Sequence, residues 1–251
     1  MYHFFTTPEN ISKDTVTITG TDVNHIKNVL RMKVGEDVLI SDGTGIDHTC
    51  KIAAISDDEI ICEITGSGES LSEPSVRFYL FQGLPKSDKF EHIIQKSVEL
   101  GVYEIIPVQT GRSIVKYDDK KAKNKVERWQ KIAESAAKQS RRGIIPEVKN
   151  VMTFKEALKY AAGGFDGNNT EFMNIIPYEN FKDMKATREI LSEIKPGMSV
   201  GIFIGPEGGL EEKEVEMAGE LGVRSISLGN RILRTETAPL MLLSYLTFVL
   251  E

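Results

Sequence analysis

Apolar and polar residues alternate in short runs along the first 65 residues, a pattern typical of half-buried β-strands. We expect strands at residues 16–19, 38–41, 46–55 and 60–65. Asp42-Gly43 and Asp57-Asp58 separate the later runs, and such pairs are typical of hairpin turns. Between Asp22 and Leu30 the apolar residues return to helical spacing, with Asp22 as the expected cap. Short strands joined by tight turns favour a small β-barrel.

Residues 66–75 are rich in Gly, Ser and Pro and interrupt this pattern. Such a composition predicts a linker. We therefore predict two domains, residues 1–70 and residues 71–251.

Beyond the linker, strand-like runs alternate with helical patterns. We expect strands at 76–82, 104–108, 172–176, 200–204 and 225–228. We expect helices at 88–100, 118–142, 211–221 and 237–250, and another that opens with a capping box at Thr153-Phe154-Lys155-Glu156. This alternation predicts an α/β fold with a mainly parallel sheet. The last helix is apolar nearly all round, which indicates burial in a core or a subunit interface.

The composition is ordinary for a soluble globular protein, and we expect a cytoplasmic one because it has only two cysteines, each in a strand-like run. No apolar run approaches the roughly 20 residues that span a bilayer, and the N-terminus lacks the pattern of a signal peptide. Cys50 and Cys62 lie in strand-like runs, so we expect buried free thiols. The four histidines form no metal-ligand spacing, so we expect no metal site.

Charge is distributed unevenly around a net value of −6. Residues 1–70 hold five Lys/Arg and twelve Asp/Glu, whereas residues 112–149 hold twelve Lys/Arg and five Asp/Glu. A basic stripe on a neutral body is expected of a protein that binds phosphates. A solvated helix face would have the same composition, so charge alone leaves both interpretations open.

Two glycine-containing loops carry the clearest chemical signal. Gly205-Pro206-Glu207-Gly208-Gly209 follows one expected strand, and Leu228-Gly229-Asn230-Arg231 follows another. Ligands of open α/β sheets bind at the carboxyl ends of strands. The first loop has no Gly-Lys-Ser/Thr and carries a glutamate that would repel a pyrophosphate. It therefore favours an uncharged or cationic ligand, approached closely by the glycine backbone.

Four charged residues have competing interpretations. Glu236 suits an ion pair or a helix cap at the start of the last helix. Arg234 is the better functional candidate, because it follows the apolar pair Ile232-Leu233 and would be held rigidly. Arg141-Arg142 ends the basic helix, where cations favourably meet the helix C-terminus. This interaction with the helix C-terminus explains one arginine more easily than two in a row.

Two longer segments that contain these loops, Gly205–Leu210 and Leu228–Ala238, together resemble the C-terminal motifs of the SPOUT-type methyltransferases, and more closely those of the bacterial ribosomal RNA small-subunit methyltransferase E family. The likeness covers almost the whole chain. Its other motifs are 24–32, 88–102, Arg112-Ser113, 129–133 and Gln139-Ser140-Arg141-Arg142 through Pro146.

This resemblance implies a small PUA-like β-barrel at the N-terminus, a catalytic domain with a deep trefoil knot, and a homodimer. It implies S-adenosylmethionine as the methyl donor, without a metal, and N3 of a uridine in 16S rRNA of the small ribosomal subunit as the acceptor. The implied donor contacts are Ile176, Pro177, Ile204, Gly205, Glu207, Gly208, Gly209, Leu228, Gly229, Ile232 and Leu233.

Methylation of N3 requires loss of a proton, so the site must stabilise the developing imidate. We assign that role to Arg234, with Glu236 as its catalytic neighbour, and we expect Arg31, Arg112, Arg141 and Arg142 to bind RNA. At His3 the chain departs from the family, which usually has Arg there; a neutral His would hold RNA weakly. The alternatives are a ribose 2′-O-methyltransferase of the same superfamily and a non-catalytic RNA-binding protein.

Overall fold

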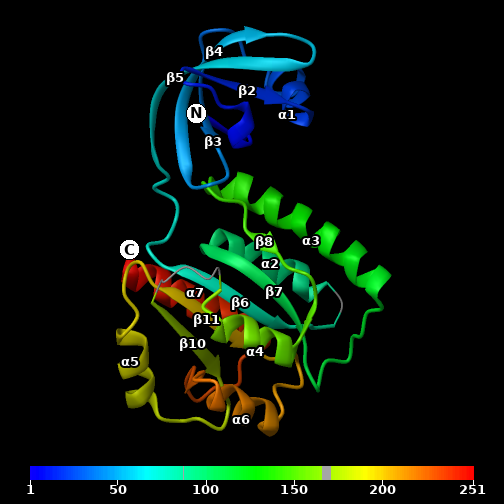
Figure 1. Cartoon of the computed structure of the whole chain (residues 1–251), viewed down its shortest axis with the longest axis vertical. Helices are drawn as coiled ribbons and strands as arrows, with labels where there is room; N and C mark the ends of the chain where they lie inside the picture. The colour runs from blue at the N-terminus through cyan, green and yellow to red at the C-terminus, as the bar shows by residue number, and fades with distance from the viewer. Residues whose placement is uncertain (87, 166–170) are drawn as a thin grey trace. The chain divides into compact units, whose positions relative to one another are not determined.

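The structure is a computed structural model that describes residues 1–86, 88–165 and 171–251. The chain divides into two compact units (Figure 1). The first consists of Met1–Glu73 with Ala137–Ile145, and the second of Pro74–Ala136 with Pro146–Glu251. The chain thus returns to the first unit for nine residues, a return that the linear pattern of hydrophobic positions does not indicate.

The first unit is built on a five-stranded sheet. Its strands are β1 (Tyr2–Phe5), β2 (Thr15–Thr19), β3 (Asp37–Ser41), β4 (Ile46–Ile55) and β5 (Glu59–Glu69), in the order β1-β3-β4-β5-β2. Only β1 and β3 are parallel. The edge strands approach each other, because Thr6 Oγ1 donates to the carbonyl oxygen of Thr17 at 3.2 Å. A short 3-10 turn, η1 (Pro8–Asn10), joins β1 to β2.

Two expectations for this unit were wrong in detail. The expected helix is a four-residue α1 (Thr21–Asn24) that continues as a π-helix, η2 (His25–Val29), and Gly20 rather than Asp22 occupies the N-cap. Residues 66–69 are not a linker. They prolong β5 and pair with β4, because pairing satisfies the backbone hydrogen-bonding groups of a Gly/Ser-rich segment as well as those of an apolar one.

The core of the first unit buries both cysteines, Cys50 and Cys62, as free thiols. Burial raises the pKa of Cys50 to about 11. Burial, together with the neighbouring Cys50, raises the pKa of Cys62 to about 12. Both side chains therefore behave as small apolar residues of the core.

The second unit contains a fully parallel sheet in the order β12-β10-β11-β6-β7-β8, with β9 pairing β7. Its strands are β6 (Arg77–Gly83), β7 (Val102–Gln109), β8 (Glu147–Val148), β9 (Met152–Thr153), β10 (Phe172–Pro177), β11 (Ser199–Ile204) and β12 (Arg224–Ile226). The predicted α/β fold is confirmed. Every residue of β11 is buried, as expected for a continuous apolar strand covered on both faces.

Helices cover both faces of this sheet (Figure 1). They are α2 (Lys89–Glu99), α3 (Asp119–Ser140), α4 (Phe154–Ala162), α5 (Met184–Ser192), α6 (Glu212–Glu220) and α7 (Thr237–Leu250). The predicted capping box at Thr153 and Glu156 is confirmed. Helix α5 was not predicted, although Asp183 caps it by accepting from two backbone amides.

Aromatic stacking fills the face of the sheet under α4. Phe81 stacks on Phe203 with ring centres 4.2 Å apart, and Tyr79 stacks on Phe165 at 3.9 Å. On the other face, α7 packs against α2 and buries Leu242, Leu243 and Leu246. The rigid sheet between these layers fixes the strand ends from which the loops of the site depart.

Helix α7 is buried on one side only. Met241, Tyr245, Phe248 and Val249 repeat at helical spacing along its other side, and Phe248 is 86% exposed. An apolar stripe of this kind on a helix surface needs a partner to remove it from water.

Candidate active site

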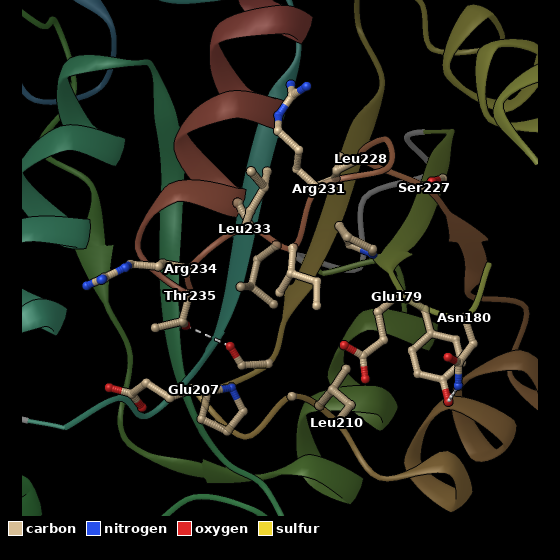
Figure 2. A pocket seen from close by; sticks show the side chains of 18 of the residues that line it. Glu179, Asn180, Glu207, Leu210, Ser227, Leu228, Arg231, Leu233, Arg234 and Thr235 are labelled. Carbon is tan, nitrogen blue, oxygen red and sulfur yellow. Dashed lines mark hydrogen bonds between the residues drawn. The ribbon is translucent and has the colours of Figure 1, made fainter. Parts of the chain in front are cut away.

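A cavity of about 650 Å³ lies where β10, β11 and β12 end. These strands are neighbours in the sheet, so the loops that follow them meet at one edge. Leu210 and Leu233 contribute apolar walls, whereas the guanidinium groups of Arg231 and Arg234 point away from the centre (Figure 2). This is the position expected for a ligand site in an open α/β sheet.

The structure brings together nearly all of the residues that the sequence predicted for this site. Those that line the cavity are Pro177, Ile204, Gly205, Glu207, Gly208, Gly209, Leu228, Gly229, Ile232, Leu233 and Arg234. Ile176 is fully buried beneath it, and its side chain belongs to the core under α4. Glu236 lies one residue past the lining residue Thr235 and is not itself a lining residue.

Glycine is required in the loop after β11 because the backbone turns back on itself. A Cβ on Gly205 would lie 2.9 Å from the carbonyl carbon of Gly209, and Gly209 has a φ of +69°. The loop is fastened from outside by Arg112, whose Nη1 donates to the carbonyl oxygen of Gly208 at 2.9 Å. Arg112, predicted to bind RNA, therefore also braces the loop of the cavity.

Two buried polar residues that the sequence did not single out hold the floor of the site. Thr235 donates its hydroxyl hydrogen to the carbonyl oxygen of Gly205 at 2.7 Å (Figure 2), and it accepts a hydrogen bond from Gln82 Nε2 at 2.9 Å. Gln82 is at the end of β6, so this chain of bonds joins three separate segments. Gln82 belongs to no motif that the sequence revealed, and Thr235 lies inside the Leu228–Ala238 motif without having been assigned a role; only their apposition in the fold identifies them.

Charged side chains form a network at the mouth of the cavity. Lys89 Nζ lies 3.3 Å from a carboxylate oxygen of Glu207 and 3.3 Å from one of Glu236, and Arg234 lies 3.9 Å from Glu236. Burial alone would lower the pKa of Lys89, but the carboxylates of Glu236 and Glu207 outweigh it and raise that pKa. Burial would likewise raise the pKa of Glu236, yet a backbone hydrogen bond, Lys89 and Arg234 together lower it. Both groups are charged at neutral pH.

Glu207 and Arg234 differ from their sequence interpretation. The charge of Glu207, which we took as favouring an uncharged or cationic ligand, is balanced by Lys89, and its carboxylate also accepts from the Lys86 amide. Arg234 was expected to be rigidly held, but its side chain is 80% exposed. Its backbone is fixed instead, because its carbonyl oxygen accepts from the amides of Thr237 and Ala238.

Glu179 supplies a carboxylate that the sequence analysis missed. It follows β10, lines the cavity and points into it (Figure 2). Within the described ranges, no Lys, Arg or His comes within 4.0 Å of it. An unpaired carboxylate that points into the cavity favours a ligand that carries positive charge or hydroxyl groups.

The predicted RNA-binding role of Arg142 is not supported by its position. Its side chain is 2% exposed, and Nε and Nη2 donate to the two carboxylate oxygens of Glu73 at 2.8 and 2.5 Å. Glu73 also accepts from the amides of Gly143 and Ile144. Arg142 therefore closes the loop after α3 inside the first unit instead of meeting a phosphate, because a bidentate partner lies within reach.

Arg31 and Arg141 contrast with Arg142. Both are exposed, and neither lies within 4.0 Å of a carboxylate in the described chain. Both have left-handed backbones, with φ of +54° and +58°, where glycine is usually found. Arg141 ends α3 as the left-handed residue of a Schellman motif, in which Arg142 N bonds Ala137 O and Arg141 N bonds Lys138 O.

The basic helix α3 buries Trp129, Ala133 and Ala136 on its inner face, while most of its lysines are exposed. Some of its cations are neutralised locally. Lys121 pairs with Asp118, and Arg128 pairs with Glu91 at 2.8 Å. Part of the stripe is therefore a neutralised, solvated face, and contact with phosphates stays a prediction for its other cations.

Residues 1–86, 88–165 and 171–251 contain no group of three or more His, Cys, Asp or Glu side chains placed to hold a metal ion. Over the same residues, none of the helices combines the length and the apolar character needed to cross a membrane.

The parallel sheet and its cavity define an α/β enzyme with a ligand site at the strand ends, and comparison with known families specifies the class. Residues 72–247 match the family model described as the RNA methyltransferase domain, and residues 18–65 match that of the RNA methyltransferase PUA domain. Ribosomal RNA small subunit methyltransferase E of Bacillus subtilis is 41% identical, over 94% of this chain and 91% of its own length. The chain belongs to the ribosomal RNA small subunit methyltransferase E family.

Solved structures agree. Ribosomal RNA small subunit methyltransferase E from Neisseria gonorrhoeae, bound to S-adenosyl methionine, is 33% identical with a TM-score of 0.80, over 100% of this chain and 98% of its own. A methyltransferase from Legionella pneumophila in complex with the same cofactor is 27% identical with a TM-score of 0.77, over 98% and 97%. The predicted family and the PUA-like N-terminal unit are thus confirmed.

Proposed function

We propose that this protein transfers a methyl group from S-adenosylmethionine to N3 of a uridine in 16S rRNA of the small ribosomal subunit. Membership of the family supports the type of reaction. One observation in the structure supports S-adenosylmethionine as the donor: the cavity at the strand ends combines a glycine backbone, apolar walls and the unpaired Glu179 carboxylate. The loop after β11 has no lysine to hold a phosphate.

The residues present fit this donor. Gly205–Gly209 and Leu228–Leu233 would hold its adenosine part by close backbone approach, and Glu179 would face its cationic or hydroxyl-bearing end. When bound, S-adenosylmethionine supplies an electrophilic methyl group on a sulfonium sulfur. The protein contributes position and exclusion of water, which account for much of the rate in such transfers.

Arg234 is our candidate for stabilising the uracil as N3 loses its proton. Its backbone is fixed at the start of α7 while its guanidinium remains exposed, so it can meet a carbonyl oxygen of a base that arrives from solvent. Glu236, 3.9 Å away, would orient that guanidinium. Because N3 is on the Watson–Crick edge, the uridine must be unpaired or flipped when it reacts.

We further propose that the protein acts as a homodimer in the cytoplasm. The exposed stripe of α7, Met241, Tyr245, Phe248 and Val249, supports a second copy as the partner that covers it. Phe248→Asp should convert the dimer to a monomer in sedimentation velocity. A wild-type protein that sediments as a monomer at all concentrations would contradict the proposal.

The experiment that tests the function is mapping of reverse-transcription stops on 16S rRNA incubated with the protein and S-adenosylmethionine. An N3-methyl group blocks pairing and should produce one strong stop, which wild-type protein gives and Arg234→Ala does not. Arg231→Ala, which removes an exposed arginine from the same loop, is the matched control. A ribose 2′-O-methyl product would leave the base edge free, and absence of donor binding in calorimetry would indicate a non-catalytic RNA-binding protein.

A further inference from the structure

Lys89 occupies an unfavourable place for a cation. It is the first residue of α2, where the positive end of the helix dipole favours acids, and the N-cap Asp88 makes no side-chain cap bond. The side chain is nevertheless one-third exposed and lines the cavity. Two carboxylates compensate for this position: Glu207 and Glu236, each 3.3 Å from Nζ.

These two carboxylates come from different segments of the donor site. Glu207 is in the loop between β11 and α6, and Glu236 is at the N-terminal end of α7. Without a cation between them, they would repel each other across the mouth of the cavity. Arg234, at 3.9 Å, faces only Glu236, and the Lys86 amide faces only Glu207. Lys89 alone contacts both, among the residues that the structure describes.

We infer that Lys89 is a positioning residue of the donor cavity, which holds the Gly205–Gly209 loop and the start of α7 together by binding Glu207 and Glu236 at once. Its effect is on donor affinity, because these are the segments that would contact the adenosine part. This inference rests on the proposed donor, S-adenosylmethionine. It assigns Lys89 no contact with the reacting atoms.

The experiment measures the S-adenosylmethionine Kd by calorimetry and the donor KM and kcat of rRNA methylation. Lys89→Met should weaken donor binding roughly tenfold, the scale of coupling between charges in contact, and raise KM while kcat at saturating donor changes far less. Lys89→Arg keeps the bridge and should stay close to wild type. Lys96→Met is the matched control, because it removes an ammonium of similar exposure, paired with Glu99, from the same helix.

The double variant Lys89→Met/Glu236→Gln removes the repulsion together with the cation and leaves Glu207, an implied donor contact, in place. Its donor Kd should return most of the way to that of wild type. This recovery can be measured even if the single variant Lys89→Met does not fold. A double variant with no recovery, or a Lys89→Met variant with wild-type Kd, overturns the inference. A wild-type protein that binds no S-adenosylmethionine would instead overturn the proposed function.

Discussion

The hydroxyl of Thr235 lies 2.7 Å from the carbonyl oxygen of Gly205 and donates its hydrogen to it, while Gln82 donates to the same hydroxyl. Thr235 is 6% exposed, so water cannot replace these bonds. The end of β6, the loop after β11 and the start of α7 are thereby joined at one atom. The donor cavity depends on this junction as much as on its glycines.

Thr235→Val keeps the shape of the side chain and removes the hydroxyl. It leaves the Gly205 carbonyl without this donor, so we expect about 1–2 kcal/mol lower unfolding free energy. Donor affinity should fall as well, because the loop loses its anchor. Urea titration and calorimetry measure the two effects. Thr235→Ser should preserve both; a Val variant with unchanged donor affinity would show that the junction does not shape the cavity.

Gly205→Ala tests the close turn of the loop directly. The new Cβ would lie 2.9 Å from backbone carbon and about as close to the Leu210 amide, so the loop must move. We expect donor binding to fall below detection in calorimetry while the far-ultraviolet circular dichroism stays unchanged. Gly219→Ala, where a Cβ meets nothing within 4 Å, is the control. Retained binding in Gly205→Ala would show that the loop is more adaptable than its geometry indicates.

Arg142→Ala should destabilise the first unit by about 3–5 kcal/mol, the range for breaking a buried ion pair and leaving one charge behind. Glu73, whose side chain is 16% exposed, would keep only the amides of Gly143 and Ile144 as partners. Urea titration checks this prediction. Arg142→Ala/Glu73→Gln should recover part of the loss, and an Arg142→Ala variant as stable as wild type would contradict the structural role given to this arginine.

Arg141→Gly separates stability from RNA binding at the neighbouring position. Glycine relieves the left-handed backbone, so unfolding free energy should rise by about 1 kcal/mol. Affinity for 16S rRNA should fall, and the slope of log K against log salt should decrease by about one unit, because one phosphate contact is lost. Filter binding over a salt series measures this slope. An unchanged slope would exclude a phosphate contact at Arg141.

His3 makes the stability of the first unit depend on pH. Burial lowers its pKa below the ordinary 6.5. Asp47 and a hydrogen bond with the Lys138 backbone oppose this shift, whereas the charges of Arg141 and Lys138 add to it. His3 in the unfolded chain therefore binds a proton as the pH falls below about 6.5, whereas His3 in the folded chain stays neutral until a lower pH. Stability should be complete above that pH and decrease as pH falls towards the folded pKa. His3→Gln should weaken the decrease between pH 7.5 and 5.5 in urea titrations; an identical pH profile would assign it to other groups.

The sequence predicted the secondary structure of the second unit well, because strands such as Val200–Ile204 are buried on both faces and leave an uninterrupted apolar run. Capping residues marked the start of α4 with equal clarity. Prediction failed where backbone pairing overrode composition, as at Gly66 and Ser67 in β5. It also failed at α5, a short helix that the chain pattern did not distinguish from a loop.

The sequence by itself determined the α/β class, the two glycine loops and the family, because these depend on residue type and order along the chain. Only the tertiary structure decided the use of the charged residues. It buried Arg142 against Glu73, exposed Arg141, and placed Lys89 between Glu207 and Glu236. Charges interact through space. The members of these ion pairs lie between 69 and 147 positions apart in the chain, so no local sequence pattern could have revealed the pairs.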